Sequence, residues 1–405
     1  MKSILKAAPI VVTALAFAVF AQGQAPRPAA PPDDSLKAAS PLTRLFTQDA
    51  YTEYALLDDP ATASFGIVFM PLETRAGATV LINGTRHGSD GGDVAVFDPR
   101  TGKPLAFEYI GGDEAIKRKL PGNFTPEDHY IIAQLPWAVP EGGEGRVLIK
   151  KTYKDARTYY PDGPDGIVWV RGLSAQRFGV ILPKGYSLVS SNIAAQVMAL
   201  QDGRLKLALT NPSGGGSPLT IRAKKTGTVF AGNKMGDKVY DDVKTLYDLG
   251  EPDTHTFRVE QNYSDYRKGA TARLDLLGYV PVKNPKVIDL DTAKALSTMQ
   301  DGSATVAKLE VPIVDDKQSA HLKVSGEAQD PAFKVENGDL VFERELHGLR
   351  NTVLLPAGWE VAGVSQPATI GTYQGRVFVA FVNIQAEDGV KVNIRARKKA
   401  AGATS

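Results

Sequence analysis

The sequence predicts an all-β protein made of two tandem homologous antiparallel β-sandwich units. Three observations point to this fold class: a set of motifs that recurs at constant spacing, many short runs of β-forming residues, and very few segments with helical periodicity. A repeat of this length indicates a duplicated structural unit. Short strands closed by turn residues are typical of antiparallel sandwiches.

The repeat is clearest in the C-terminal part of each unit. The segment ILPKGY at Ile181–Tyr186 recurs as LLPAGW at Leu354–Trp359, 173 residues later. The segment IRAKK at Ile221–Lys225 recurs as IRARK at Ile394–Lys398, with the same spacing. A shared spacing over both segments indicates duplication rather than chance similarity.

The N-terminal parts of the two units match at a larger spacing. Asp58–Phe65 corresponds to Gly250–Phe257, 192 residues later, and the spacing is 191 where Asp98 and Thr101 correspond to Asp289 and Thr292. The first copy therefore carries about 18 extra residues, placed between Leu105 and Ile167. We expect unit 1 at residues 46–230 and unit 2 at residues 238–399.

Local patterns predict strands, hairpins and two short helices. Leucines at 205, 207 and 209 alternate with other residues, which predicts a half-buried strand. The corresponding segment 376–382 is almost continuously apolar, which predicts a strand covered on both faces. Helices are expected only at Asp113–Leu120 and Asp291–Met299. Tight hairpin turns are expected at Asn83-Gly84, Asp202-Gly203, Asn337-Gly338 and Asp388-Gly389, and a hairpin loop at Gly214-Gly215-Gly216.

The N-terminus has the pattern of an export signal. Lys2 and Lys6 precede an apolar run from Ala7 to Phe20, and small residues follow before Gln24. This pattern predicts a signal peptide at residues 1–23, followed by an Ala/Pro-rich linker at residues 24–45. No segment is long enough for a transmembrane span, so we expect a periplasmic or secreted protein. The chain has no cysteine and hence no disulfide framework.

Composition and motifs exclude several classes of function. The formal net charge of +2, with 23% charged residues, gives no reason to expect a nucleic-acid partner. The five histidines are not spaced as zinc ligands and are expected in turns or on strand surfaces. No HExxH, GxSxG, phosphate-loop or dinucleotide motif occurs. We therefore expect no metal and no cofactor, and the sequence favours a non-catalytic protein.

The most distinctive local feature is the segment Tyr159–Gly166, YYPDGPDG, at the end of the extra segment of unit 1. Exposed tyrosines beside carboxylates can stack on a sugar ring or anchor a protein partner. The predicted ligand-binding residues are accordingly Tyr159, Tyr160, Asp162 and Asp165. Asp162 and Asp165 offer oxygen atoms of the kind that bind calcium, but two carboxylates are too few for a convincing calcium loop, so no metal is expected here. The alternative is a sharp turn without a binding role, because Pro and Gly favour such turns.

Other conspicuous side chains have structural interpretations. The three tryptophans, Trp137, Trp169 and Trp359, correspond to large apolar residues in the other copy, which predicts core positions. Lys150, Lys151 and Lys154 form a basic cluster, and such strand lysines are expected to be solvated. A phosphate-rich or anionic-glycan partner for these lysines is the alternative.

Two of the repeated segments resemble a known domain. The strand at Asp59–Phe65, with its second copy, and the motifs at Leu182–Tyr186 and Leu355–Trp359 are similar to strands in the N-terminal β-domain of glycyl-aminopeptidase-like zinc metallopeptidases. The resemblance implies a β-domain that flanks an active site in those enzymes. The zinc-binding helix of that family has no counterpart in this sequence, so neither zinc nor peptidase activity is implied.

These observations lead to three hypotheses of different classes. The leading one is a non-catalytic exported protein of the bacterial envelope that binds or scaffolds an envelope protein or a glycan. The alternative is a polysaccharide-active hydrolase or lyase that uses paired carboxylates on a β-sandwich as acid and base. The third is a purely structural spacer. The sequence leaves the ligand, the oligomeric state and the packing between the units open.

Overall fold

The structure is a computed structural model that describes most of the chain. The described residues are 50–85, 90–173, 175, 177–211, 217–232, 243–265, 268–270, 273–276, 282–301, 304–384 and 389–399. The predicted signal peptide at 1–23, the linker at 24–45, the loop at Gly214–Gly216 and the residue Asp388 lie outside these ranges.

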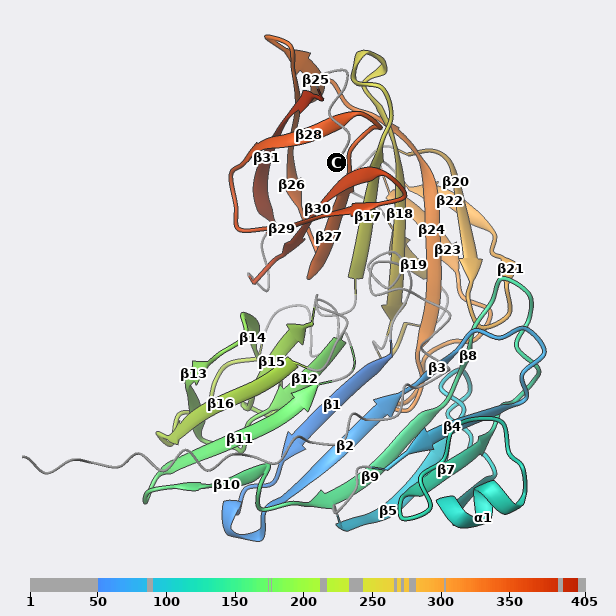
Figure 1. Cartoon of the computed structure of the whole chain (residues 1–405), viewed down its shortest axis with the longest axis vertical. Helices are drawn as coiled ribbons and strands as arrows, with labels where there is room; N and C mark the ends of the chain where they lie inside the picture. Colours follow the sequence, from blue (N-terminus) through green and yellow to red (C-terminus); the bar gives the residue numbers. More distant parts are fainter. Residues whose placement is uncertain are drawn as a thin grey trace, which may run out of the picture.

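The described chain is almost entirely β-structure, which confirms the all-β fold class (Figure 1). The α-helix α1 (Gly112–Lys117) confirms the helix expected at Asp113–Leu120. Its acidic first turn and its terminal lysine complement the helix dipole. The helix expected at Asp291–Met299 is wrong: a turn there leads into β21 (Lys294–Ala295) and β22 (Thr298–Asp301). Two 3-10 turns complete the helical segments of the described chain: η2 (Pro60–Thr62) and η3 (Pro252–Thr254).

The first half is built on a seven-stranded sheet with the order β14-β15-β12-β1-β2-β9-β5. Its strands are antiparallel except for the parallel pair β1–β12. The strands are β1 (Tyr51–Leu56), β2 (Ser64–Met70), β5 (Asp90–Phe97), β9 (Leu148–Lys154), β12 (Arg177–Ile181), β14 (Ala195–Ala199) and β15 (Leu205–Thr210).

Smaller sheets accompany the seven-stranded sheet. A four-stranded sheet has the order β10-β11-β16-β13, a three-stranded sheet the order β4-β7-β6, and β3 pairs with β8. Their strands are β3 (Leu72–Glu73), β4 (Val80–Gly84), β6 (Phe107–Gly111), β7 (His129–Gln134), β8 (Gly145–Arg146), β10 (Tyr159–Asp162), β11 (Gly166–Leu173), β13 (Tyr186–Ser191) and β16 (Ser217–Lys225).

The first half encloses two main hydrophobic cores. In the larger core, Phe65 and Phe178 of the seven-stranded sheet pack with Trp169 of the four-stranded sheet. In the smaller core, Ile149 of β9 packs with Ile131 of the three-stranded sheet. The strand β9 contributes to both cores, so it crosses the boundary between them.

The second half is built on an eight-stranded sheet with the order β21-β20-β24-β18-β17-β27-β30-β29, in which β17 and β27 are parallel. A four-stranded sheet, β25-β26-β31-β28, and a three-stranded sheet, β19-β23-β22, accompany it. The remaining strands are β17 (Val243–Leu249), β18 (Thr256–Asp265), β19 (Arg273–Leu276), β20 (Val282–Asp289), β23 (Ala304–Lys308), β24 (Ala320–Gln329), β25 (Phe333–Glu336), β26 (Asp339–Leu346), β27 (Arg350–Leu354), β28 (Trp359–Val364), β29 (Thr369–Tyr373), β30 (Arg376–Val382) and β31 (Val390–Lys398).

The strand orders of the two halves correspond. Reading β5-β9-β2-β1-β12-β15-β14 against β20-β24-β18-β17-β27-β30-β29 pairs each strand with its counterpart, and the parallel pair occupies the same place in both sheets. The four-stranded sheets correspond in the same way. This correspondence is what a duplicated unit would produce, and the duplication with its unit boundaries remains a prediction.

Two strand-burial predictions are wrong. The strand β15 is buried on both faces, not half-buried: Lys206 pairs with Glu53 at 3.0 Å, and Ala208 joins a cluster with Leu349 of the second half. The strand β30, expected to be covered on both faces, keeps several partly exposed side chains, while Phe378 and Phe381 are buried.

The turn predictions have mixed outcomes. The turn at Asn337-Gly338 is confirmed, since both residues have positive φ (51° and 85°) between β25 and β26. The turn at Asp202-Gly203 is also confirmed, with Gly203 at φ 83°. Asn83-Gly84 instead lies at the end of β4. No helix among the described ranges has both the length and the hydropathy that a bilayer crossing requires.

Candidate functional site at the junction of the two halves

The predicted ligand-binding residues fall on the edge strand β10 and the turn after it. Tyr160 is half-buried, and Asp162 and Asp165 are exposed. Asp162 accepts a hydrogen bond from Arg222 at 2.5 Å. Whether these three side chains bind a ligand remains a prediction.

Tyr159 does not have the exposure that the sequence suggested. Its side chain is fully buried, its hydroxyl donates to the carbonyl of Leu57 at 2.8 Å, and it pairs with Trp169 across β10 and β11. Burial raises the pKa of Tyr159, with a smaller contribution from the neighbouring Tyr186. Because side chains alternate along a strand, β10 turns Tyr159 into the core and Tyr160 away from it.

The core prediction for the tryptophans holds for two of the three. Trp169 and Trp359 are buried, whereas Trp137 is 36% exposed. The indole N–H of Trp137 donates to the backbone carbonyl of Asp291 at 3.0 Å, and the Arg100 guanidinium lies 6.0 Å from the ring centroid. Asp291 belongs to the second half, so Trp137 lies at a junction between the halves.

Backbone hydrogen bonds connect the halves reciprocally at this junction. The amide of Glu144 donates to the carbonyl of Leu290 at 2.8 Å, and the amide of Ser319 donates to the carbonyl of Pro99 at 2.7 Å. Pro99 and Leu290 are 191 residues apart, which is the repeat spacing of the surrounding segments. Each half thus gives and receives the same kind of contact, as in a two-fold interface.

Two ion pairs of a largely buried arginine reinforce these contacts, one to the buried Asp289 and one to the exposed Glu310. Arg100 of the first half bonds to Asp289 at 3.1 Å and to Glu310 at 2.6 Å, both in the second half. The Arg100 side chain is only 14% exposed. Removing one partner of such a pair would leave the other charge buried and uncompensated, which is destabilising. Arg100 therefore helps to hold the two halves together.

A second group at the junction consists of three buried side chains, in which a histidine contacts an aspartate on one side and a serine on the other. His321 Nδ1 lies 3.1 Å from Asp291 Oδ2, and its Nε2 lies 3.2 Å from Ser319 Oγ. This is the hydrogen-bond order of a nucleophilic triad. All three side chains are nevertheless buried, whereas a nucleophile must reach a substrate carbon. His321 also contradicts the expectation that the histidines lie in turns or on strand surfaces.

The neighbouring carboxyls Asp289 and Asp291 have pKa values shifted in opposite directions. Burial raises the pKa of Asp289, and the charge of Asp291 adds to this effect. Burial acts to raise the pKa of Asp291 as well, but the charge and hydrogen bond of His321, with Arg146 and Arg100, lower it overall. Such opposed shifts are a known feature of acid–base pairs.

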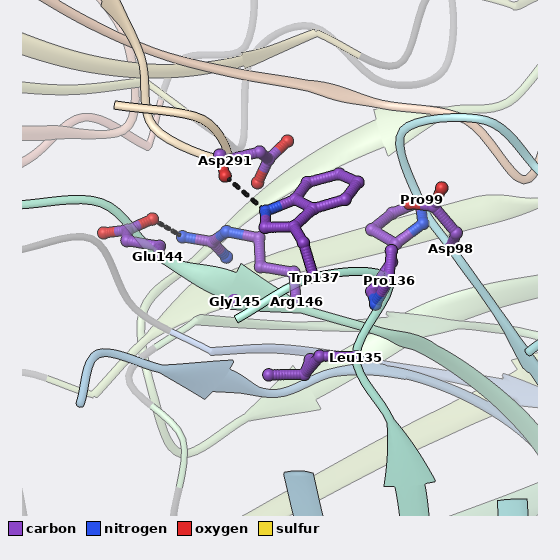
Figure 2. A pocket seen from close by; sticks show the side chains of 9 residues that line it. All are labelled: Asp98, Pro99, Leu135, Pro136, Trp137, Glu144, Gly145, Arg146 and Asp291. Carbon is purple, nitrogen blue, oxygen red and sulfur yellow. Dashed lines mark hydrogen bonds and ion pairs between the residues drawn. The ribbon is translucent and has the colours of Figure 1, made fainter. Parts of the chain in front are cut away.

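The space beside these groups is small (Figure 2). The pocket has a cavity volume of about 10 Å³, which is room for about one water molecule. Trp137 and Asp291 meet across it, and Arg146 bonds to Glu144 at its edge. Its lining residues are Asp98, Pro99, Leu135, Pro136, Trp137, Glu144, Gly145, Arg146 and Asp291.

The described residues contain no group of three or more His, Cys, Asp or Glu side chains placed to share a metal ion. Sequence reasoning missed the junction residues Arg100, Asp291 and His321. One signal pointed toward them: the aspartate turn at Asp98 recurs at Asp289. In the structure Asp98 accepts from the amide of Arg100 at 2.9 Å, and Asp289 accepts from the amide of Asp291 at 3.0 Å.

Comparisons with known proteins add little to this geometry. No protein-family model matches the chain, and no curated protein matches it. One solved structure, an aminopeptidase N family protein from Idiomarina loihiensis, is similar at 12% identity and a TM-score of 0.26. The match covers 38% of this chain and 29% of that one. A likeness at this TM-score does not establish the resemblance to glycyl-aminopeptidase-like zinc metallopeptidases.

Proposed function

We propose that the chain is a non-catalytic exported protein, periplasmic or secreted, that binds or scaffolds an envelope protein or a glycan. In this proposal, units at residues 46–230 and 238–399 form one rigid body. The observation that carries the proposal is the packing at this junction: reciprocal backbone bonds and the ion pairs of Arg100 cross it, and the pocket beside Trp137 and Asp291 has space for about one water. Close packing at this pocket favours a role in presenting surfaces over a catalytic role there.

The proposed binding surface comprises Tyr160, Asp162 and Asp165 on the β10 edge. An aromatic ring beside carboxylates suits contact with sugar hydroxyls or with a protein partner. Tyr159 belongs to the support of this surface, because its buried ring and its bond to Leu57 hold β10 in place.

The test is a binding screen with the mature chain against a glycan array and envelope extracts. The double variant Tyr160→Ala/Asp165→Asn removes the ring of Tyr160 and the negative charge of Asp165. Lys334→Ala is the matched control, because Lys334 is the corresponding residue of β25 in the second half. We expect the wild type and the control to bind the same partner, and the double variant to bind it about ten-fold more weakly or worse. Absence of any partner would contradict the binding function, and equal binding by all three proteins would contradict the proposed surface.

A second candidate function is a polysaccharide-active enzyme. The observation that favours it is the adjacent pair Asp289 and Asp291, two buried carboxyls with pKa values shifted apart. The small volume of the pocket counts against it. Release of reducing ends from an envelope polysaccharide, lost in Asp289→Asn, would support this candidate over the first.

A further inference from the structure

Lys151 lies on the boundary between the two hydrophobic cores of the first half. The side chains of Ile149, Lys151 and Tyr153 share one face of β9, because residues two apart along a strand point the same way. Ile149 belongs to the smaller core and Tyr153 to the larger one. Lys151 itself is only 7% exposed, so the prediction of a solvated lysine is wrong at this position.

Arg171 of the facing sheet reaches the same place. Its guanidinium lies 5.0 Å, 5.7 Å and 5.8 Å from the ring centroids of Tyr54, Phe65 and Tyr153, respectively. The sheet register places Ile67 opposite both Tyr54 and Lys151. A guanidinium that spans these three rings therefore lies over Ile67 and next to Lys151.

Among the described residues, the two cations share no carboxylate. Lys151 Nζ donates to the amide oxygen of Asn83 at 3.1 Å and lies 5.2 Å from the Tyr153 ring. Arg171 has cation–π contacts but no hydrogen bond or ion pair among the described residues, and its buried Nη1 is without a partner there. Desolvation, with repulsion from Arg171, lowers the pKa of Lys151 to about 8. Paired positive charge without a counterion is costly away from water.

In the second half, the arginine that corresponds to Arg171 has a carboxylate partner. Arg344, 173 residues after Arg171, lies over Tyr247 and Phe257 in the same manner, and its guanidinium bonds to Asp330. Gly326 takes the place of Lys151, since it pairs with Val259 as Lys151 pairs with Ile67. A Cβ at Gly326 would lie 2.0 Å from Val282 Cγ1, so this half has no room for a lysine there.

We propose that Lys151 and Arg171 bind an oxyanion, namely a carboxylate, phosphate or sulfate group, at the boundary between the two cores of the first half. The guanidinium fork suits two oxygens of such a group, and the ammonium supplies a third charged donor. Asn83 and Arg171 are both partly exposed, so an anion could reach the site from solvent between these two residues. The proposal is independent of whether the protein is a binding protein or an enzyme.

The test measures thermal unfolding at pH 7 with sodium acetate, phosphate or sulfate, each against sodium chloride at equal ionic strength. Lys151→Met keeps the volume of the side chain and removes its charge. Lys154→Met is the matched control, because Lys154 is exposed at the end of the same strand. We expect at least one oxyanion to raise the unfolding temperature of the wild type and the control more than that of Lys151→Met. General salt effects act on all three proteins alike, and the effective anion identifies the group.

Identical shifts in the three proteins would overturn the proposal. A second measurement needs no variant: the Lys151 side-chain resonance is titrated by NMR with and without the anions. A bound anion stabilises the ammonium and raises the pKa of Lys151 above about 8. A titration unchanged by all three anions would likewise overturn the proposal.

Discussion

Arg171 and Arg344 occupy corresponding places in the two halves, yet Arg344 bonds to a carboxylate, Asp330, and Arg171 has no such partner among the described residues. Both guanidiniums lie over a tyrosine and a phenylalanine of the underlying sheet. The halves therefore share an architecture and differ in charge balance at one equivalent position.

Lys151→Met should be more stable than the wild type at pH 7. The pKa of Lys151 is about 8 in the folded state and about 10.5 in the unfolded chain, so the native protein carries the full cost of the buried charge below pH 8. That cost is relieved as the pH rises from about 8 to 10.5. We expect Lys151→Met to gain up to about 3 kcal/mol at pH 7, with a smaller gain at pH 10. Urea unfolding at both pH values measures this; a gain independent of pH would contradict it.

Arg100→Met should destabilise the protein by about 3 kcal/mol or more, because Asp289 would remain buried without its partner. Calorimetry should also show the two halves unfolding less cooperatively. Arg118→Met is the control, since Arg118 forms a surface pair with Glu108 and such pairs contribute little. Equal effects of the two substitutions would show that Arg100 does not tie the halves together.

Asp291→Asn should be less stable than the wild type at pH 7, and the two proteins should become similar in stability in acid. The pKa of Asp291 is lowered in the folded state, so its contribution is present above the unfolded value of 3.8 and disappears as the pH falls through the folded pKa. We expect the difference in unfolding free energy between variant and wild type to shrink below about pH 4. A difference that is constant from pH 7 to pH 3 would argue against the Asp291–His321 pair as its source.

Ser319 should not react with a serine-directed fluorophosphonate probe, although Ser319, His321 and Asp291 contact one another in the order found in a catalytic triad. Its side chain is buried beside His321, so the probe has no approach to Oγ. Stoichiometric labelling that is lost in Ser319→Ala, detected by intact-mass spectrometry, would show that the group is a nucleophilic site.

The sequence predicted features that repeat and missed features that depend on contact between the halves. The period-two pattern of β15 identified a strand, but Ala208 is covered by Leu349 from the other half, which no local pattern records. The same limit applies to Trp137. In the repeat, Leu135-Pro136-Trp137 matches Val311-Pro312-Ile313, and Ile313 is buried, whereas Trp137 itself reaches the junction.

The candidate sites were predicted less well than the fold. The segment around Tyr159 was conspicuous, but residue types alone do not give the phase of a strand, and Tyr159 is the side chain that β10 turns inward. Lys151 was expected in solvent because lysines rarely face a core. Lys151 is buried because β9 runs from one hydrophobic core to the other and Lys151 lies between them. This arrangement depends on how the sheets pack, which the local sequence does not show.

Incubation of the mature protein with purified envelope glycans distinguishes binding from hydrolysis most directly, because the glycan retained by the protein and the new reducing ends are measured in the same sample. We expect the wild type to retain the glycan, Tyr160→Ala/Asp165→Asn to retain less of it, and neither protein to produce new reducing ends. New reducing ends that disappear in Asp289→Asn would contradict this expectation and would assign the junction carboxyls to catalysis.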